Sequence, residues 1–279
     1  MRSCPYGQLL FQYRYPDEYG IINTVTNPIL EGFMSKIVFL GDLHGNFVAT
    51  KAMEEEIASI KPDLVWFLGD AVGKGPENIE TCDWVREHCD LCLKGNWDDF
   101  VYECYSKRDD PNQHPFDKEN VYFGRQLGEE RLNWLYSLPY ESEILISGLR
   151  FRLVHGRPTD QLLQGYDGDE KFAQSFCSID KKTQFDSLIC ADSHRPYVRA
   201  MHEGYAINTG SVGNSIGVPR AHGLLIEGDL DSEKISPIRF TILSVPYDNQ
   251  RAADIAIATE GLPMKESFAK EVLTGIYSR

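Results

Sequence analysis

The sequence predicts an α/β fold in which two β-sheets pack face to face with helices on the outside. Two observations carry this prediction. The first half of the chain alternates apolar runs with helical segments, which is the order of a right-handed βαβ unit with parallel strands. The second half consists mostly of short strands. With 279 residues, 42% of them hydrophobic, the chain can bury the core of one large domain.

The elements of the first half follow from apolar runs and helical periodicity. The expected strands are residues 36–41, 64–68 and 89–94, and the helices between them are residues 47–60 and 77–87. Glutamates 54 to 56 mark the solvated face of the first helix. Parallel strands place their carboxyl ends on one edge of the sheet, where open α/β sheets bind ligands.

The remaining elements are helices, a hairpin and single strands. Helices are expected at about 97–106 and 119–137, and the stretch from about 100 to 137 forms a helical wall. Residues 143–146 and 151–154 form a hairpin around Ser147 and Gly148. Later strands are expected at 187–190, 197–201, 205–208, 223–227 and 240–245, and C-terminal helices at about 248–259 and 264–275.

Residues 1–33 differ from the rest of the chain. They are rich in aromatic residues, contain Pro5, Pro16 and Pro28, and show no sustained periodicity. We expect a poorly ordered N-terminal extension in front of a single domain, residues 34–279, with Met34 as the functional start. The alternative is a short strand or arm that packs on the sheet edge.

The formal net charge of −14 excludes some classes of partner. Sequence-independent binding to a nucleic-acid polymer or an anionic membrane requires clusters of Lys and Arg, and the chain has none. An acidic protein can still bind phosphoesters if divalent cations supply positive charge locally. No apolar stretch reaches the roughly 20 residues of a membrane-spanning helix, and we see no signal peptide. We therefore expect a cytoplasmic protein.

Seven cysteines without regular spacing argue against a disulfide framework. Cys89 and Cys92 form a C-x-x-C pair, but we expect them on a strand, where residues three apart point to opposite faces. Such a pair does not readily share a metal ion. Buried thiols in a reducing cytosol are the preferred interpretation.

Three apolar runs end in glycine next to a carboxylate, amide or imidazole. Asp42 and His44 follow the first run, Asp70 follows the second, and Asn96 follows the third. Each residue alone is more readily explained as a helix cap. Three in series on one sheet edge instead indicate a metal site, and a metal site at such an edge is typical of hydrolases.

The second half of the chain supplies further metal-binding side chains. His155 follows one apolar run, and Asp192 and His194 follow another. Carboxylate, imidazole and amide donors together suit Mn²⁺, Fe²⁺, Zn²⁺ or Mg²⁺. The expected ligands are Asp42, His44, Asp70, Asn96, His155, Asp192 and His194.

From Lys36 onward, the series of motifs resembles the calcineurin-like metallophosphoesterase superfamily. The blocks of that family are D-x-H, G-D, G-N-H-[DE], a histidine, and G-H-x-H, and this chain follows them in order with two departures. Segments 69–76 and 208–213 look most like the bacterial branch of small phosphodiesterases, which includes asymmetric diadenosine-tetraphosphate hydrolases. The resemblance implies a four-layer α-β-β-α sandwich of two mixed sheets, the metallo-dependent phosphatase-like fold.

Carried over by position, the resemblance implies two divalent metal ions. One ion would be held by Asp42, His44, Asp70 and His194, and the other by Asp70, Asn96, His155 and Asp192, with Asp70 as the bridge. Asp70, Asn96 and Asp98 are the implied catalytic residues. The implied reaction is attack by a metal-bound water on a small phosphodiester or nucleotide, dinucleoside polyphosphates included.

Two residues depart from the family pattern. Trp97 stands where the family has a histidine that assists the leaving group, and indole offers one N–H donor without acid–base chemistry. This predicts a reliance on activated leaving groups, such as aryl or nucleoside-polyphosphate esters. Asp192 replaces a histidine ligand, and we expect it to bind metal; the alternative is that it misses the metal and leaves a weak second site.

Basic residues beside these loops are candidate phosphate ligands. Arg157 and Arg195, within two residues of His155 and His194, rank first. Lys74 in the glycine-rich turn and Lys94 follow. Trp97 is a further candidate substrate contact by stacking on a base, with packing as an aromatic wall as the alternative. The backbone of residues 208–211 could present N–H groups to a phosphate, or simply turn the chain.

Two alternative functions stay open. A protein Ser/Thr phosphatase is disfavoured by Trp97, because the alkoxides of Ser and Thr are poor leaving groups. A degenerate fold that serves as a non-catalytic binding module, as in the retromer subunit with this fold, is suggested by Trp97 and Asp192. The unaltered ligands argue against it.

Overall fold

The computed structural model describes residues 14–16, 22–24 and 34–278. The chain divides into two compact units, Met1–Phe33 and Met34–Arg279. In the first unit, β1 (Arg14–Pro16) pairs antiparallel with β2 (Ile22–Thr24). The expectation of poor order for the rest of this segment falls outside the described residues.

One five-stranded sheet of the second unit has the order β12-β11-β3-β4-β5. Its strands are β3 (Ser35–Leu40), β4 (Leu64–Phe67), β5 (Leu91–Cys92), β11 (Ala221–Gly228) and β12 (Arg239–Val245). The strands β3, β4 and β5 run parallel, whereas β11 pairs antiparallel with both β3 and β12. The sheet is therefore mixed, with β3 at its centre.

The other five-stranded sheet has the order β6-β7-β8-β10-β9. Its strands are β6 (Glu141–Ile146), β7 (Leu149–Val154), β8 (Ser187–Cys190), β9 (Tyr197–Ala200) and β10 (Tyr205–Asn208). The central strands β7, β8 and β10 run parallel, and β6 and β9 are antiparallel edges. Ser147 and Gly148, with φ of 52° and 81°, form the tight turn of the expected hairpin.

Alternating side chains on the strands divide the core between the two faces of each sheet. On β3, Ile37 and Phe39 join an apolar cluster with Phe151 and Ile207 of the other sheet. Val38 and its neighbours on the opposite face belong to a cluster that includes helical residues. The two sheets therefore pack face to face, and the predicted α/β sandwich of two mixed sheets is confirmed.

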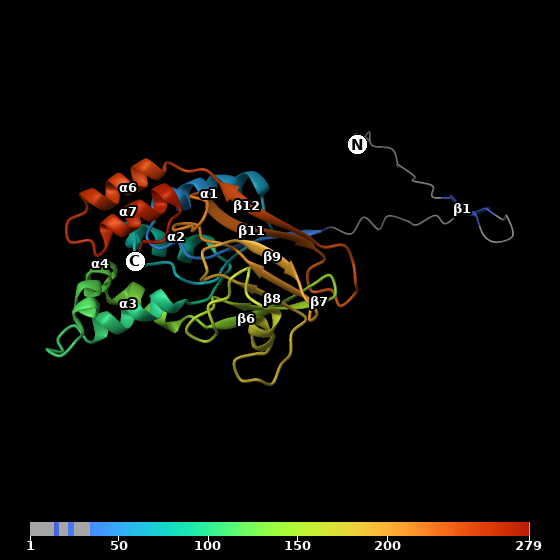
Figure 1. Cartoon of the computed structure of the whole chain (residues 1–279), viewed down its shortest axis with the longest axis horizontal. Coiled ribbons are helices and arrows are strands. Elements are labelled where there is room, and N and C mark those ends of the chain that lie inside the picture. Colours follow the sequence, from blue (N-terminus) through green and yellow to red (C-terminus); the bar gives the residue numbers. More distant parts are fainter. Residues whose placement is uncertain (1–13, 17–21, 25–33, 279) are drawn as a thin grey trace, which may run out of the picture. The chain divides into compact units, whose positions relative to one another are not determined.

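Helices cover the outer faces of the sandwich. The longer ones are α1 (Phe47–Ile60), α2 (Asn78–His88), α3 (Asn96–Ser106), α4 (Pro115–Ser137), α6 (Asn249–Ala258) and α7 (Lys265–Thr274). Figure 1 shows α6 and α7 beside α1, and residues of all three share one apolar cluster. In the described part of the chain, no helix is long and apolar enough to cross a membrane.

The outer face of the second sheet is covered by two short elements that the sequence did not predict, α5 (Asp169–Phe172) and η1 (Ala173–Phe176). Phe172 and Phe176 pack there in a cluster with Leu188 of β8. Single turns of four residues are too short to show a helical period.

The region of residues 89–94 differs from the prediction. Helix α2 continues to His88 and Cys89 caps it, so only Leu91 and Cys92 are strand. Strand alternation therefore does not separate Cys89 from Cys92, so that prediction was wrong, and the Cys89 thiol is hydrogen-bonded to that of Cys92. This hydrogen bond and burial raise the pKa of Cys89 well above its usual value. The six described cysteines are all free thiols.

Candidate metal centre

The loops that follow β3, β4 and β8 hold their polar residues in the left-handed backbone region. Asp42, His44, Asp70, Asp192 and His194 have φ of 55°, 48°, 61°, 64° and 57°. L-residues other than glycine rarely adopt this region, and such conformations gather at functional sites. Hydrogen bonds between loops stabilise them, because the Asp42 and His44 amides donate to the carbonyls of Gly69 and Asp70.

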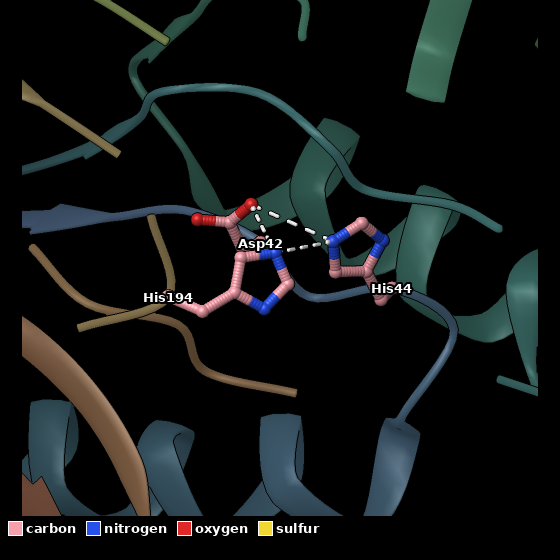
Figure 2. A group of neighbouring side chains, drawn as sticks. All are labelled: Asp42, His44 and His194. Atoms are coloured by element: carbon pink, nitrogen blue, oxygen red, sulfur yellow. Dashed lines mark hydrogen bonds and ion pairs between the residues drawn. The ribbon is translucent and has the colours of Figure 1, made fainter. Parts of the chain in front are cut away.

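Asp42, His44 and His194 converge on one point, as Figure 2 shows. Asp42 Oδ1 lies 3.5 Å from His44 Nε2 and 3.3 Å from His194 Nε2, and the two Nε2 atoms are 3.3 Å apart. Each Nδ1 contacts a backbone carbonyl, at 3.2 Å from Val72 for His44 and 2.6 Å from Asn214 for His194. An Nδ1–H bond of this kind directs the Nε2 lone pair toward a ligand.

A second group consists of Asp42, Asp70 and His155. His155 Nε2 lies 3.3 Å from Asp70 Oδ2 and 3.9 Å from Asp42 Oδ1, while its Nδ1 is 2.9 Å from the Leu68 carbonyl. Asp70 Oδ2 is also 3.5 Å from His44 Nε2. Both carboxylates therefore lie between the imidazoles of the two groups, and Asp42 is the member that the groups share.

Buried oxygen atoms that lack hydrogen bonds show whether these residues fit a metal ion. Asp42 Oδ1 and Asn96 Oδ1 are buried and have no hydrogen-bond partner among the described residues. A buried polar atom without a partner is costly, at about 1–3 kcal/mol, and a cation bound there removes that cost. Asn96 opens α3 next to Gly95, where a Cβ would overlap the Asp70 carboxylate. Oxygen and imidazole donors in this arrangement fit divalent cations.

The electrostatics of the cluster also favour a cation. Burial raises the pKa of Asp42 to about 8, and the charges of Asp70 and Asp192 add to this against the opposing effect of His155. Burial alone lowers the pKa of His155, but the charges of Asp70, Asp42 and Asp192 outweigh it and raise that pKa to about 10. The cluster without metal therefore retains protons, which a divalent ion displaces on binding.

A comparison with known proteins identifies this combination of fold and donor groups. A family model described as calcineurin-like phosphoesterase matches residues 35–230. That span is more than half of the chain and contains every predicted ligand. The chain belongs to the calcineurin-like phosphoesterase family. An uncharacterised protein of Methanocaldococcus jannaschii is 25% identical over 235 residues, which cover 78% of this chain and 90% of that protein.

Two solved structures share the fold of this calcineurin-like phosphoesterase. A metallophosphoesterase from Sphaerobacter thermophilus has a TM-score of 0.65 at 23% identity, covering 87% of this chain and 99% of its own. A hypothetical protein from Pyrococcus horikoshii has a TM-score of 0.68 at 21% identity, covering 88% and 100%. At these identities the similarity supports the fold, so the bacterial phosphodiesterase branch stays a prediction.

Asp192 is not a member of either donor group of this phosphoesterase. Its Oδ1 lies 4.0 Å from His155 Nε2, and both of its oxygens accept hydrogen bonds from Arg157. Burial alone raises the pKa of Asp192, but the Arg157 hydrogen bonds hold it below its usual value. Arg157, predicted to bind phosphate, is therefore bound to a predicted metal ligand.

Asp98 joins the two loops that carry Asp70 and Asn96. Its Oδ2 accepts hydrogen bonds from the amides of Gly95 at 2.9 Å and Asp70 at 2.8 Å, and its Oδ1 accepts one from Ala71 at 3.1 Å. The side chain is fully buried. These contacts give Asp98 a positioning role in the family's third block.

Lys74 and Trp97 lie beside the first donor group. Lys74 Nζ is buried, 3.1 Å from His194 Nε2, and lies 5.6 Å from the centre of the Trp97 ring. Trp97 donates its backbone N–H to Asp70 Oδ1 at 2.7 Å, and its ring packs edge-to-face on His44 and Phe123. Trp97 is therefore part of the aromatic wall of the centre.

The other predicted phosphate ligands lie in different surroundings. Arg195 is half-buried, and its Nη1 is 3.5 Å from Gln164. Lys94 is buried, bonds Asp99 at 2.9 Å and the Tyr136 carbonyl at 3.0 Å, and lies over two tyrosine rings. Those contacts assign Lys94 to the support of α3 and α4.

Sequence reasoning missed two polar residues that support the first group. The Asn214 carbonyl accepts the His194 hydrogen bond, and its side-chain amide donates to Glu271 Oε2 at 3.0 Å. Glu271 is fully buried on α7, outside the matched family span. The one signal available in the sequence was a charged residue on the apolar side of a C-terminal helix.

Proposed function

We propose that this protein is a metal-dependent phosphodiesterase that hydrolyses small phosphodiesters or nucleotides, dinucleoside polyphosphates among them, with two divalent ions. The observation that carries the proposal is the pair of buried donor groups that share Asp42. When bound, such ions supply positive charge to a phosphoryl group and lower the pKa of a water molecule.

The residues around the groups support the choice of a diester. Lys74 and Arg195 offer positive charge to the phosphoryl oxygens, since Lys74 Nζ is 3.1 Å from His194 Nε2 and Arg195 directly follows that histidine. The indole N–H of Trp97 can donate a hydrogen bond but is too weak an acid to protonate a departing alkoxide. The leaving group therefore departs without protonation by this residue, which favours aryl oxides and nucleoside phosphates over alkoxides.

Asp70→Asn tests the proposal. We expect it to abolish Mn²⁺-stimulated hydrolysis of a chromogenic aryl phosphodiester, because Asp70 Oδ2 lies within 3.5 Å of both His44 and His155. Asp254→Asn on the exposed face of α6 is the matched control and should retain the wild-type rate. An Asp70→Asn rate equal to that of the wild type rejects the site. A panel of dinucleotides with Mn²⁺, Fe²⁺, Zn²⁺ and Mg²⁺ then identifies substrate and metal.

The second candidate function is a non-catalytic binding module. The bond between Arg157 and Asp192 favours it, because that bond occupies a predicted ligand of the second ion. Elemental analysis of the metal-replete protein distinguishes the two, since fewer than one ion per chain favours the module. A protein Ser/Thr phosphatase is tested by comparing aryl monoester and diester rates, and monoester preference would support it.

A further inference from the structure

The Arg157–Asp192 pair lies at the edge of the second donor group. Arg157 Nη2 is 2.6 Å from Asp192 Oδ1, and Nε lies 3.2 Å from Oδ1 and 2.9 Å from Oδ2. The backbone N–H of Arg157 adds a bond to Oδ2 at 3.1 Å. A carboxylate offers about four lone-pair positions, so these four contacts occupy its hydrogen-bonding capacity.

Through this pairing, both oxygens of Asp192 accept hydrogen bonds from Arg157, and Asp192 is farther from His155 than Asp70 is. Its Oδ1 is 4.0 Å from His155 Nε2, whereas Asp70 Oδ2 is 3.3 Å from the same nitrogen. An ion bound by Asp70 and His155 therefore gains Asp192 as a ligand only if Arg157 gives up part of its contact. The guanidinium and the second ion compete for one carboxylate.

The side chain of Arg157 is half exposed, whereas the backbone beside it lies close against Asp192. Gly156 has a φ of 142°, and a Cβ there would lie 2.8 Å from the Asp192 Cβ, so the loop fits directly against Asp192. The side chain of Asp192 is 3% exposed and that of Arg157 is 50% exposed. A guanidinium binds phosphate as readily as carboxylate, with the same bidentate geometry. A phosphate group arriving from solvent can therefore engage the exposed side of Arg157.

We propose that Arg157 holds Asp192 away from the second ion until the phosphate group of a substrate engages Arg157 and releases Asp192 to that ion. The second ion and a phosphate ligand then bind with positive coupling, and each raises the affinity of the other by the same factor. This inference rests on the proposed function to the extent that the centre must bind metal. The new element is that the substrate controls occupancy of the second ion.

Mn²⁺ titrations of the wild type and of Arg157→Gln, followed by calorimetry and by the electron paramagnetic resonance of paired ions, test the first half of the inference. We expect Arg157→Gln to bind the second ion on the order of tenfold more tightly, because charge-assisted hydrogen bonds no longer hold Asp192. Arg157→Lys keeps the charge without the bidentate contact and should be intermediate. Arg150→Gln removes an exposed arginine paired with Glu143 and should leave both affinities unchanged.

Dimethyl phosphate, a diester with poor leaving groups, tests the second half. Dimethyl phosphate should raise the second-ion affinity more in the wild type than in Arg157→Gln. Direct contact between phosphate and metal would raise that affinity equally in the two proteins. Weaker second-ion binding in Arg157→Gln would mean that Arg157 orients Asp192 as a ligand, and it would overturn the inference. Equal coupling in the two proteins overturns the release step. A wild type that takes up no Mn²⁺ overturns the proposed function as well, so the two failures are distinguishable.

Discussion

The two halves of the metal centre hold their side chains through different contacts. The first half is Asp42, His44 and His194; its two histidines each contact a carbonyl through Nδ1, and their Nε2 atoms lie within 3.5 Å of Asp42. The second half is the set of ligands predicted for the second ion, Asp70, Asn96, His155 and Asp192, and Asp42 joins two of them in the second donor group. There Asn96 Oδ1 has no hydrogen-bond partner in the described part of the chain, and Asp192 is bound by Arg157.

The metal-binding side chains are therefore better pre-organised in the first half than in the second. An ion entering the first half meets three donors already in position, so little side-chain entropy is lost on binding. Under the competition proposed above, an ion entering the second half competes with the Arg157 guanidinium for Asp192, its fourth donor. We therefore expect the ions to bind in order, the first half before the second. The following substitutions break or sharpen this comparison.

Asp42→Asn should have the largest effect, because Asp42 belongs to both donor groups. We expect loss of both ions and a fall in diesterase rate of about 10³-fold or more, since several kcal/mol of transition-state stabilisation depend on them. The same substitution should raise the melting temperature of the metal-free protein, because it removes a buried carboxyl whose pKa is raised to about 8 by burial. Thermal unfolding with and without Mn²⁺ measures both effects. A metal-free protein that melts at a lower temperature than the wild type would contradict the expectation.

His222 tests the support beneath the first half. Its Nδ1 contacts Ser215 at 2.8 Å, Ser215 bonds the Ser211 carbonyl, and the Ser211 hydroxyl donates to the Asp42 carbonyl. Burial lowers the pKa of His222 from 6.5 to about 4, with a smaller contribution from Arg220. His222 is therefore protonated more readily in the unfolded chain than in the folded one. The free energy of unfolding is unaffected by His222 above pH 6.5 and decreases as the pH falls toward 4.

His222→Asn should remove this loss, which is on the order of 3 kcal/mol between those pH values. Urea unfolding at several pH values gives the free energy of unfolding as a function of pH. The slope of that dependence between pH 6.5 and 4 should be smaller in the variant than in the wild type. The exposed His202 offers the control His202→Asn, which should keep the wild-type slope. An unchanged slope in His222→Asn would show that His222 is not responsible for the acid sensitivity.

Asp192→His restores the residue of the family pattern and should remove the asymmetry between the halves. An imidazole cannot accept two bonds from a guanidinium, so Arg157 loses its hold on the second-ion position. We expect second-ion affinity to rise about tenfold and to stop depending on Arg157. Mn²⁺ titration of Asp192→His with and without Arg157→Gln measures both. If adding Arg157→Gln to Asp192→His raised the second-ion affinity further, competition between Arg157 and that ion would not be the cause.

The same comparison separates what the sequence could predict from what it could not. Asp42, His44 and Asp70 were predictable because each follows an apolar run and a glycine, and strand order alone brings such residues to one sheet edge. The bond between Arg157 and Asp192 depends on side-chain direction and on the left-handed turn at Gly156, which no periodicity records. Local signals locate the ligands, and long-range packing decides how firmly they are held.

The hydrogen bonds behind His194 could not be read from local pattern either, because Asn214 and Glu271 meet across 57 positions of the chain. Helix α7 brings Glu271 there from outside the matched family span. The two C-terminal helices were predicted from the sequence, and residues of α6 and α7 share an apolar cluster with strands and α1. Their polar contribution to the metal centre is visible only in three dimensions.

Glu271→Gln should have the smallest effect, and one confined to the first half. Glu271 accepts hydrogen bonds at both oxygens, from Asn214 at 3.0 Å and from the Ser278 amide at 3.0 Å, whereas glutamine has one acceptor oxygen. Asn214 then holds His194 less firmly. Direct partners of metal ligands contribute 10- to 100-fold to metal affinity, and Glu271 is one residue further away, so we expect first-ion affinity to fall by about three- to tenfold.

Separate Mn²⁺ affinities from the same titration measure this change, with the exposed Glu260→Gln as the matched control. A general loss of stability would lower the affinity for both ions alike. A role in positioning His194 lowers the affinity for the first ion and leaves that for the second unchanged. Equal losses at both positions would therefore assign Glu271 to the fold alone. A loss restricted to the first ion would place the C-terminal helix among the elements that make the first half the firmer of the two.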